Sequence, residues 1–317
     1  MKAAIVHNAG EAPAFGSFDT PSAQPGEWQL RVTASALTPL TRARASGQHY
    51  SSSGQFPLVP GVDGVGRRED GQHVYFLLPR APYGALAEET VASAAHCIAL
   101  PDGLDDVTAA AIANPGMSSW AALTERARFK AGETVLINGA TGASGQLAVQ
   151  IAKHRGAGKV VATGRDEGAL RALASLGADL LIPLSGDADS LEAKFKEQFA
   201  QRIDVVLDYL WGASAERLLI AAAKASPERI PVRFVQIGNA SGANITLPGA
   251  VLRSSAIELM GSGLGSVPLD RLLAAIDGVF KAAIAARLTL ATKTMPLSAI
   301  GAAWTISERQ RIVITVD

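Results

Sequence analysis

Two patterns of hydrophobic and polar positions follow one another along the chain. From Met1 to about Pro115, short apolar stretches are cut at close intervals by Gly, Pro and Ser, and helical spacing is scarce. Such punctuation is typical of an irregular, mostly β domain. From about Gly116 to Gly261, β-rich runs alternate with alanine-rich segments whose apolar residues recur at helical spacing. This second pattern predicts an α/β domain with a parallel, doubly wound sheet.

The predicted elements of the second region alternate in type, as a series of βαβ units requires. Strands are predicted over Thr134 to Ile137, Lys159 to Thr163, Asp204 to Asp208 and Arg233 to Ile237. Helices are predicted over "ALRALASLGA" and over "SAERLLIAAAKA". The tail beyond this region adds one more amphipathic helix, over Leu269 to Arg287, and a last strand over Arg311 to Val316.

The first strand of this series leads into a turn of small residues and then into a helix predicted over Gln146 to Arg155. The turn has the form A-x-G-x-x-G and consists of Ala140, Thr141, Gly142, Ala143, Ser144 and Gly145. Gly142 would let the backbone approach a pyrophosphate, whose charge the helix N-terminus attracts, and Gly145 would let the helix pack close to the strand. Because a second strand follows about 20 residues later, we expect a dinucleotide site and not merely a packed βα junction.

The tip of the second strand bears on which dinucleotide is bound. An NAD site usually carries Asp or Glu at this point, to bond the ribose 2′-hydroxyl. Here the tip is Gly164-Arg165, and the planar fork of Arg165 suits the 2′-phosphate of NADPH. Asp166 argues the other way, but it stands where the next helix needs an N-cap. We therefore expect NADPH.

Composition narrows the classes of function. At 317 residues with 48% hydrophobic content, the chain has room for two domains with sizeable cores. Its 29 basic and 29 acidic residues balance without a dense basic block, which argues against a nucleic acid partner. The single Cys97 fits a reducing compartment, and neither a signal peptide nor an apolar run of about 18 residues is present. We expect a cytoplasmic protein that does not bind membranes.

An ordered set of motifs carries a resemblance to a known family. It comprises "PLVPGVDGVG", "DGQHVYF", "YGALAEETV", "LPDGLDDVTAAAI", "NPGMSSWAAL", "GETVLINGATGASGQLAVQIAK", "LGAD" and "VQIG". In this set the chain resembles the medium-chain dehydrogenase/reductase superfamily, and within it the zinc-free quinone oxidoreductase-like branch. The resemblance implies a GroES-like substrate domain over residues 1–115 and 262–317, a Rossmann NADPH-binding domain over 116–261, and an active site in the cleft between them.

The residues at the metal positions separate this chain from the zinc enzymes of that superfamily. Those enzymes carry a Cys near the end of an early strand, a Gly-His-Glu motif and a lobe with four cysteines. Here Thr38 lies in the early segment, Gly61-Val62-Asp63 stands at the motif, and Cys97 is the only cysteine. We expect no metal. Without a Lewis acid, the reaction left is hydride transfer to an acceptor that is already electron-poor, a quinone or an enone-type alkene.

The resemblance also implies roles for individual residues. Tyr50 would hydrogen-bond the acceptor oxygen or donate a proton, although a loop tyrosine packed for stability is an equal alternative. The expected substrate pocket consists of Thr38, Tyr50, Asn114 and Trp120. Further cofactor contacts are expected at Ser118, Gly238, Asn239, Gly261, Ser262 and Gly263. For Trp120, ordinary helix packing is the competing interpretation.

The sequence leaves two classes of function open. The first is a zinc-independent NADPH:quinone or enone reductase, with an enoyl-thioester reductase as a variant of it. The second is a non-catalytic NADPH-binding sensor or interaction protein on the same fold. In either case, residues 243–263 resemble the branch's late edge element, which predicts a homodimer.

Overall fold

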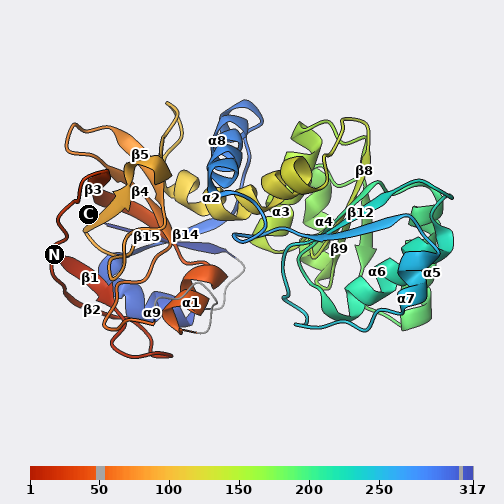
Figure 1. Cartoon of the computed structure of the whole chain (residues 1–317), viewed down its shortest axis with the longest axis horizontal. Helices are drawn as coiled ribbons and strands as arrows, with labels where there is room; N and C mark the ends of the chain where they lie inside the picture. The colour runs from red at the N-terminus through yellow and green to blue at the C-terminus, as the bar shows by residue number, and fades with distance from the viewer. Residues whose placement is uncertain (48–53, 307–309, 317) are drawn as a thin grey trace. The chain divides into compact units, whose positions relative to one another are not determined.

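The computed structural model describes residues 1–47, 54–306 and 310–316, and the chain divides into two compact units. Unit 1 consists of Met1–Asn114 and Thr289–Asp317, and unit 2 is Pro115–Leu288 (Figure 1). The first expected domain boundary, between residues 115 and 116, lies one residue after this division. The second, between residues 261 and 262, precedes the observed division by one helix.

That helix, α8 (Leu269–Ala285), contacts α3 of unit 2, and two glycines fix how it packs. A Cβ on Gly278 would lie 2.6 Å from the ring of Trp120, and a Cβ on Gly116 would lie 2.7 Å from the Val279 side chain. Because both contacts fall within residues 115–288, α8 belongs to unit 2.

Unit 1 is built on a seven-stranded sheet in the order β14-β15-β3-β4-β5-β7, with β6 also paired to β3. Its strands are β3 (Glu27–Ala36), β4 (Asp63–Arg67), β5 (His73–Leu77), β6 (Glu89–Ser93), β7 (Cys97–Ala99), β14 (Thr292–Pro296) and β15 (Arg311–Thr315). Apart from the parallel pair β14 and β15, neighbouring strands are antiparallel. Buried Leu30 and Val32 alternate with exposed Gln29 and Arg31 along β3, as in a strand with one face on the core.

The remaining elements of unit 1 are short. A two-stranded ladder is formed by β1 (Lys2–Ile5) and β2 (Ala14–Ser17). The helical segments are α1 (Pro39–Ala45), η1 (Ala94–His96), η4 (Leu297–Ala299) and α9 (Ile300–Thr305), and α2 (Asp106–Ala121) begins in unit 1. The expected irregular β domain is confirmed.

Unit 2 contains six parallel strands in the order β10-β9-β8-β11-β12-β13. They are β8 (Thr134–Asn138), β9 (Lys159–Gly164), β10 (Leu180–Pro183), β11 (Val205–Asp208), β12 (Val232–Gln236) and β13 (Ile257–Gly261). Val135, Leu136 and Ile137 of β8 are all fully buried, since helices cover both faces of a doubly wound sheet.

The helices of unit 2 alternate with these strands. They are η2 (Ala122–Arg126), α3 (Ala143–His154), α4 (Glu167–Ala172), η3 (Leu173–Leu176), α5 (Ala188–Ala200), α6 (Gly212–Ala225), α7 (Gly249–Arg253) and α8. Phe195 and Phe199 of α5 pack with Leu218 of α6 in one core cluster, together with buried residues of the sheet. The predicted α/β fold, with its Rossmann sheet, is therefore confirmed. Among the described helices, none has both the length and the apolar character needed to span a bilayer.

Candidate cofactor and substrate site

A tight turn of small residues joins β8 to α3 at the carboxyl edge of the parallel sheet. Gly139 follows the strand with a φ of +87°, a left-handed conformation that favours glycine. It lies one position before Ala140, the first residue of the A-x-G-x-x-G turn. Gly142 is the N-cap of α3, which begins at Ala143 and not at the predicted Gln146. The last three residues of the A-x-G-x-x-G motif therefore form the first turn of the helix.

The other two glycines of the turn differ in what surrounds them. A Cβ on Gly145 would lie 2.4 Å from the carbonyl oxygen of Gly139 and 2.5 Å from the Cα of Ala140, so the close packing expected of Gly145 is confirmed. A Cβ on Gly142 would meet no described atom within 4 Å. The backbone at Gly142 is thus open beside the N-terminus of α3, whose amides and dipole favour an anion.

A buried polar cluster holds the turn against the neighbouring strands. The backbone N–H of Gly139 donates to Thr163 Oγ1 (3.1 Å), and that hydroxyl donates to Asn138 Oδ1 (2.8 Å). Asn138 Nδ2 then donates to Asp208 Oδ1 (2.8 Å) and to Ser214 Oγ (2.9 Å). Burial raises the pKa of Asp208, while the hydrogen bonds that it accepts oppose this shift. The cluster ties the ends of β8, β9 and β11 into one rigid edge.

The tip of β9 lies against the glycine turn. A Cβ on Gly164 would lie 2.5 Å from Thr141 Cγ2, so glycine is required for this approach. Asp166 Oδ1 accepts a hydrogen bond from the N–H of Ala169 (2.8 Å) and caps α4, as predicted. Arg165 is exposed, and no residue in the described ranges forms an ion pair with it. The arginine, and not the carboxylate, is therefore available to a ligand at this tip.

A hollow of about 340 Å³ lies where β11, β12 and β13 end. Its lining residues are Trp211, Gln236, Asn239, Ala243, Leu259, Met260 and Gly261. Two of the residues expected to contact the cofactor, Asn239 and Gly261, are among them. Gly238 lies close by, where a Cβ would come within 2.7 Å of the Tyr209 carbonyl oxygen. Ser262 donates its N–H to the Gln236 carbonyl (2.9 Å), which fixes the end of β13.

Trp211 adopts a backbone conformation that is rare outside glycine. Its φ is 55° and its ψ is −157°, which costs on the order of 1–3 kcal/mol for a residue with a side chain. The carboxylate of Asp208 holds this conformation by accepting from the N–H groups of Leu210 (3.0 Å) and Trp211 (3.2 Å). The indole packs edge-on against Phe234, with 6.5 Å between the ring centroids. This backbone conformation places the Trp211 indole in the wall of the hollow.

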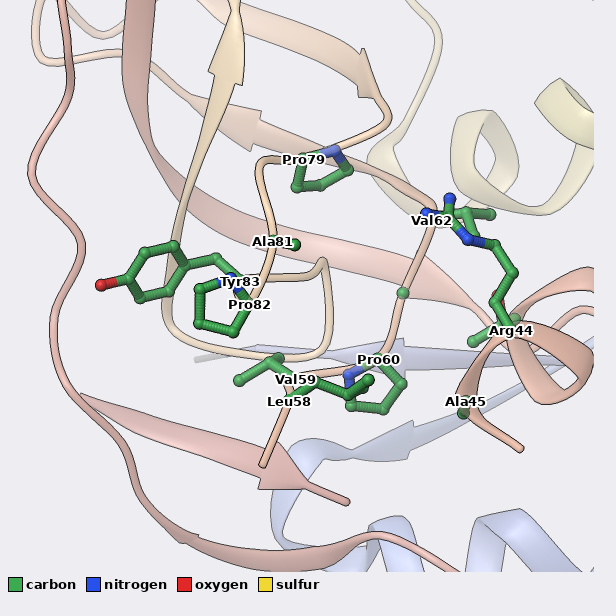
Figure 2. A pocket seen from close by; sticks show the side chains of 12 residues that line it. Arg44, Ala45, Leu58, Val59, Pro60, Val62, Pro79, Ala81, Pro82 and Tyr83 are labelled. Carbon is green, nitrogen blue, oxygen red and sulfur yellow. The ribbon is translucent and has the colours of Figure 1, made fainter. Parts of the chain in front are cut away.

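Unit 1 contains a second, smaller pocket beside α1, shown in Figure 2. Its lining residues are Thr41, Arg44, Ala45, Leu58, Val59, Pro60, Gly61, Val62, Pro79, Ala81, Pro82 and Tyr83. Thr38, expected in the substrate pocket, is buried as the N-cap of α1, where its Oγ1 accepts from the N–H of Thr41 (2.8 Å). Its capping partner Thr41 lines the pocket in its place.

Asp63 lies directly after this pocket and is fully buried. The Tyr75 hydroxyl donates to Asp63 Oδ2 (2.9 Å). The positive charge of the buried Arg311 guanidinium also attracts this carboxylate. Burial outweighs both interactions and raises the pKa of Asp63 to about 6. Asp63 of β4 therefore interacts with Arg311 of β15 and does not line the pocket.

Comparison with known proteins identifies the family. The chain is similar to "Probable NADPH-dependent quinone reductase tdiC" of Emericella nidulans, with 28% identity over 96% of both chains. It is also similar to the quinone oxidoreductase from Thermus thermophilus, whose crystal structures include a complex with NADPH, with 26% identity, a TM-score of 0.82, and coverage of 99% of this chain and 100% of that one. The chain belongs to the medium-chain dehydrogenase/reductase superfamily.

Two further comparisons concern parts of this oxidoreductase. The family model described as "Zinc-binding dehydrogenase" matches residues 143–278. The 2-methylene-furan-3-one reductase of Solanum lycopersicum is 32% identical over 56% of this chain and 48% of its own length. Despite the description of the family model, no group of three His, Cys, Asp or Glu side chains that could hold a metal ion occurs in the described parts of the oxidoreductase.

The residues expected on α2 have packing contacts in this oxidoreductase. Ser118 Oγ donates to the Pro115 carbonyl (2.7 Å) and lies beside the buried hydroxyl of Tyr209. The Trp120 ring packs on Gly278, and its centroid lies 5.0 Å from the Arg155 guanidinium, which agrees with the helix-packing interpretation. Asn114 is half-buried on the same helix.

Two other expectations remain untested by these contacts. Tyr50, the expected proton donor, lies outside the described residues. Gly263 donates its N–H to Ser266 Oγ (2.8 Å) in a turn after β13, and this contact neither supports nor opposes a cofactor role.

The sequence pattern alone did not predict the polar cluster or the role of Trp211. A signal for the cluster was present, because Asn138, Thr163 and Asp208 are polar residues at the carboxyl ends of three strands predicted to be parallel. No local signal marked Trp211.

Proposed function

We propose that this protein is an NADPH-dependent reductase that transfers a hydride to a quinone or an enone-type alkene without zinc. The observation that carries the proposal is the edge formed by Gly142 and Arg165: an open backbone at the N-terminus of α3 beside an exposed arginine, with Asp166 engaged as a helix cap. The relatives named as NADPH-dependent quinone reductase and quinone oxidoreductase support the same cofactor and acceptor class.

The chain's residues fit NADPH in three places. The backbone at Gly142 receives the pyrophosphate, with the α3 dipole favouring its charge. Arg165 pairs with the 2′-phosphate through its planar fork. Asn239 and Gly261 line the hollow for the nicotinamide end. When bound, NADPH supplies the hydride, and the protein's part is to position the donor beside the acceptor in a site from which water is excluded.

The residues at the metal positions support zinc independence. Thr38 is engaged as a buried helix cap, and Val62 offers no ligand atom. Burial raises the pKa of the Cys97 thiol to about 12, which disfavours the thiolate that zinc requires. An acceptor that needs no Lewis acid, such as a quinone or an activated alkene, suits this protein. The proton that completes alkene reduction comes from Tyr50 or from water.

We also propose that the protein is a homodimer through β13. This strand is an edge of the six-stranded sheet, so one row of its backbone donors and acceptors has no partner strand in unit 2. Leu259, at its centre, is 39% exposed. Two-fold pairing of such edges is a closed arrangement that satisfies both rows.

The deciding experiment follows NADPH oxidation by absorbance with three acceptor classes: a para-quinone, an enone and an enoyl thioester. Turnover with the quinone or the enone is the expected result. Turnover with the enoyl thioester alone would replace the proposed acceptor class. NADPH binding measured by calorimetry without any turnover would identify a non-catalytic NADPH-binding protein and overturn the proposal.

A further inference from the structure

The pocket of unit 1 combines one arginine with an otherwise uncharged lining. In Figure 2 the Arg44 side chain extends from α1 to lie beside Val62, and the loop of Pro79, Ala81 and Pro82 lies across from it. Among the described lining residues, Arg44 is the one that carries a charge. Most of the others are aliphatic or proline, and they form walls of low polarity.

Such walls strengthen any pairing that the arginine makes with an anion. A guanidinium stays charged at all physiological pH values, and burial lowers the pKa of Arg44 because it removes water from the charge. Its five N–H donors lie in a planar fork, so an anion can be bound in addition to contacts within the chain. Because the Coulomb energy rises as the local dielectric constant falls, this position favours an anion more than an exposed arginine would.

The size of the pocket limits what the anion can be. Its volume is about 50 Å³, whereas a cavity that holds a single aromatic ring measures about 150 Å³. A carboxylate fits this space, whereas the ring of a quinone does not. The pocket therefore suits one end of an acceptor and not the whole molecule.

We propose that this pocket binds a carboxylate carried by the acceptor, and that Arg44 is the residue that selects it. The inference rests on the proposed reductase function and narrows its substrate class to activated alkenes and quinones with a carboxylate group.

The neighbouring arginine on the same helix has a different task. Arg42 donates hydrogen bonds from its guanidinium to the backbone carbonyls of Ala303 and Trp304, and its guanidinium carbon lies 5.1 Å from the centre of the Trp304 ring. Arg42 therefore joins α1 to α9, and these guanidinium contacts involve none of the residues that line the pocket. Of the two arginines of α1, Arg42 stabilises the packing of the helix, and Arg44 lines the pocket.

The test uses two pairs of small molecules that differ by one charge. Monomethyl fumarate and dimethyl fumarate are activated alkenes, and monomethyl succinate and dimethyl succinate are their saturated counterparts, which cannot be reduced. Four proteins are compared: wild type, Arg44→Gln, Arg44→Lys and Arg67→Gln. Arg67 is an exposed residue of β4 outside the pocket lining, so its substitution controls for the loss of one charge from unit 1.

Arg44→Gln should raise KM for monomethyl fumarate about 10- to 150-fold, the range expected for one charge-assisted hydrogen bond. Its KM for dimethyl fumarate should stay the same, and Arg67→Gln should change neither value. Arg44→Lys keeps the charge but not the fork, so its KM for the acid should fall between those of wild type and Arg44→Gln. Equal rises for acid and ester, or no rise for the acid, would overturn the assignment of Arg44.

Binding of the succinates separates this inference from the proposed function, because it requires no turnover. Calorimetry on the protein saturated with NADPH should give a lower Kd for monomethyl succinate than for dimethyl succinate. Arg44→Gln should remove this difference in Kd. If neither fumarate is reduced but this difference is present, the reductase proposal fails while the carboxylate pocket stands. If the two succinates bind alike to wild type, the carboxylate pocket is wrong whatever the enzyme reduces.

Discussion

Two glycines of the same turn should respond in opposite ways to the same substitution. At Gly142, alanine has room and an allowed backbone, since φ is −78° and ψ is 168°. Alanine makes the unfolded chain less flexible than glycine does, which should stabilise the folded protein by about 0.4–1 kcal/mol. Alanine is also a poorer helix N-cap than glycine, which should cost about 0.5–1 kcal/mol. The melting temperature should therefore barely change.

At Gly145, alanine would overlap backbone atoms at 2.4 and 2.5 Å, which no side-chain rotation can relieve. Overpacking of this kind costs about 1–3 kcal/mol. In a unit of this size, that cost corresponds to a fall of roughly 2–12 °C in melting temperature. Gly145→Ala should thus be a stability variant.

NADPH binding should be weakened in Gly142→Ala, the variant whose melting temperature barely changes. The methyl group of Gly142→Ala would occupy the space that we propose for the pyrophosphate, so each charged hydrogen bond lost should weaken NADPH binding about 10- to 150-fold. Calorimetric titration with NADPH and thermal unfolding of the same samples provide both measurements. Unchanged NADPH affinity in Gly142→Ala would show that the pyrophosphate lies elsewhere, and equal losses of melting temperature would refute the assignment of packing to Gly145 alone.

Four further outcomes are expected. Arg165→Ala should raise KM for NADPH about 10- to 150-fold and leave KM for NADH nearly unchanged. Arg171→Ala serves as the control, because the Arg171 guanidinium pairs with Glu167 at 3.5 Å. An unchanged preference for NADPH in Arg165→Ala would assign cofactor specificity to another residue. Elemental analysis should find no stoichiometric zinc, and activity that is lost to a chelator and restored by zinc would contradict zinc independence. Light scattering at micromolar concentration should give about twice the chain mass of 32.8 kDa, and Leu259→Lys should give the single-chain mass; a wild-type protein of single-chain mass would refute the dimer. Because the pKa of Asp63 is raised from 3.8 to about 6, the folded state binds more protons across that window, so ionisation should lower the free energy of unfolding by about 3 kcal/mol as pH rises through it; urea unfolding of Asp63→Asn should lack this loss, and parallel pH profiles would contradict it.

Local chemistry explains which parts of the site the sequence could predict. The glycine turn and the Asp166 cap depend on residues within a few positions of each other, and the structure agrees with both. Their physical cause, a close backbone approach or an unsatisfied helix N–H, is present in the sequence itself.

Features that depend on distant segments were not predictable in the same way. The bond between Asn138 and Asp208 requires β8 and β11 to lie side by side, although they are far apart in sequence. The placement of α8 in unit 2 depends on Gly278 meeting Trp120, which no local pattern indicates. The pocket at Arg44 likewise requires the loop of residues 79–83 to face α1.

The position of β15 has a consequence for how the protein is made. This late strand lies between β14 and β3 and pairs Val313 with Ala36, so the ribosome completes the two partners roughly 15–55 s apart at its usual rate. Unit 2 is one continuous segment and can reach its final pairing during that interval. The edge of β3 that awaits β15 stays open throughout, and an open strand edge is prone to pair with other chains. Translation speed and chaperone supply should therefore affect the yield of this protein through unit 1 far more than through unit 2.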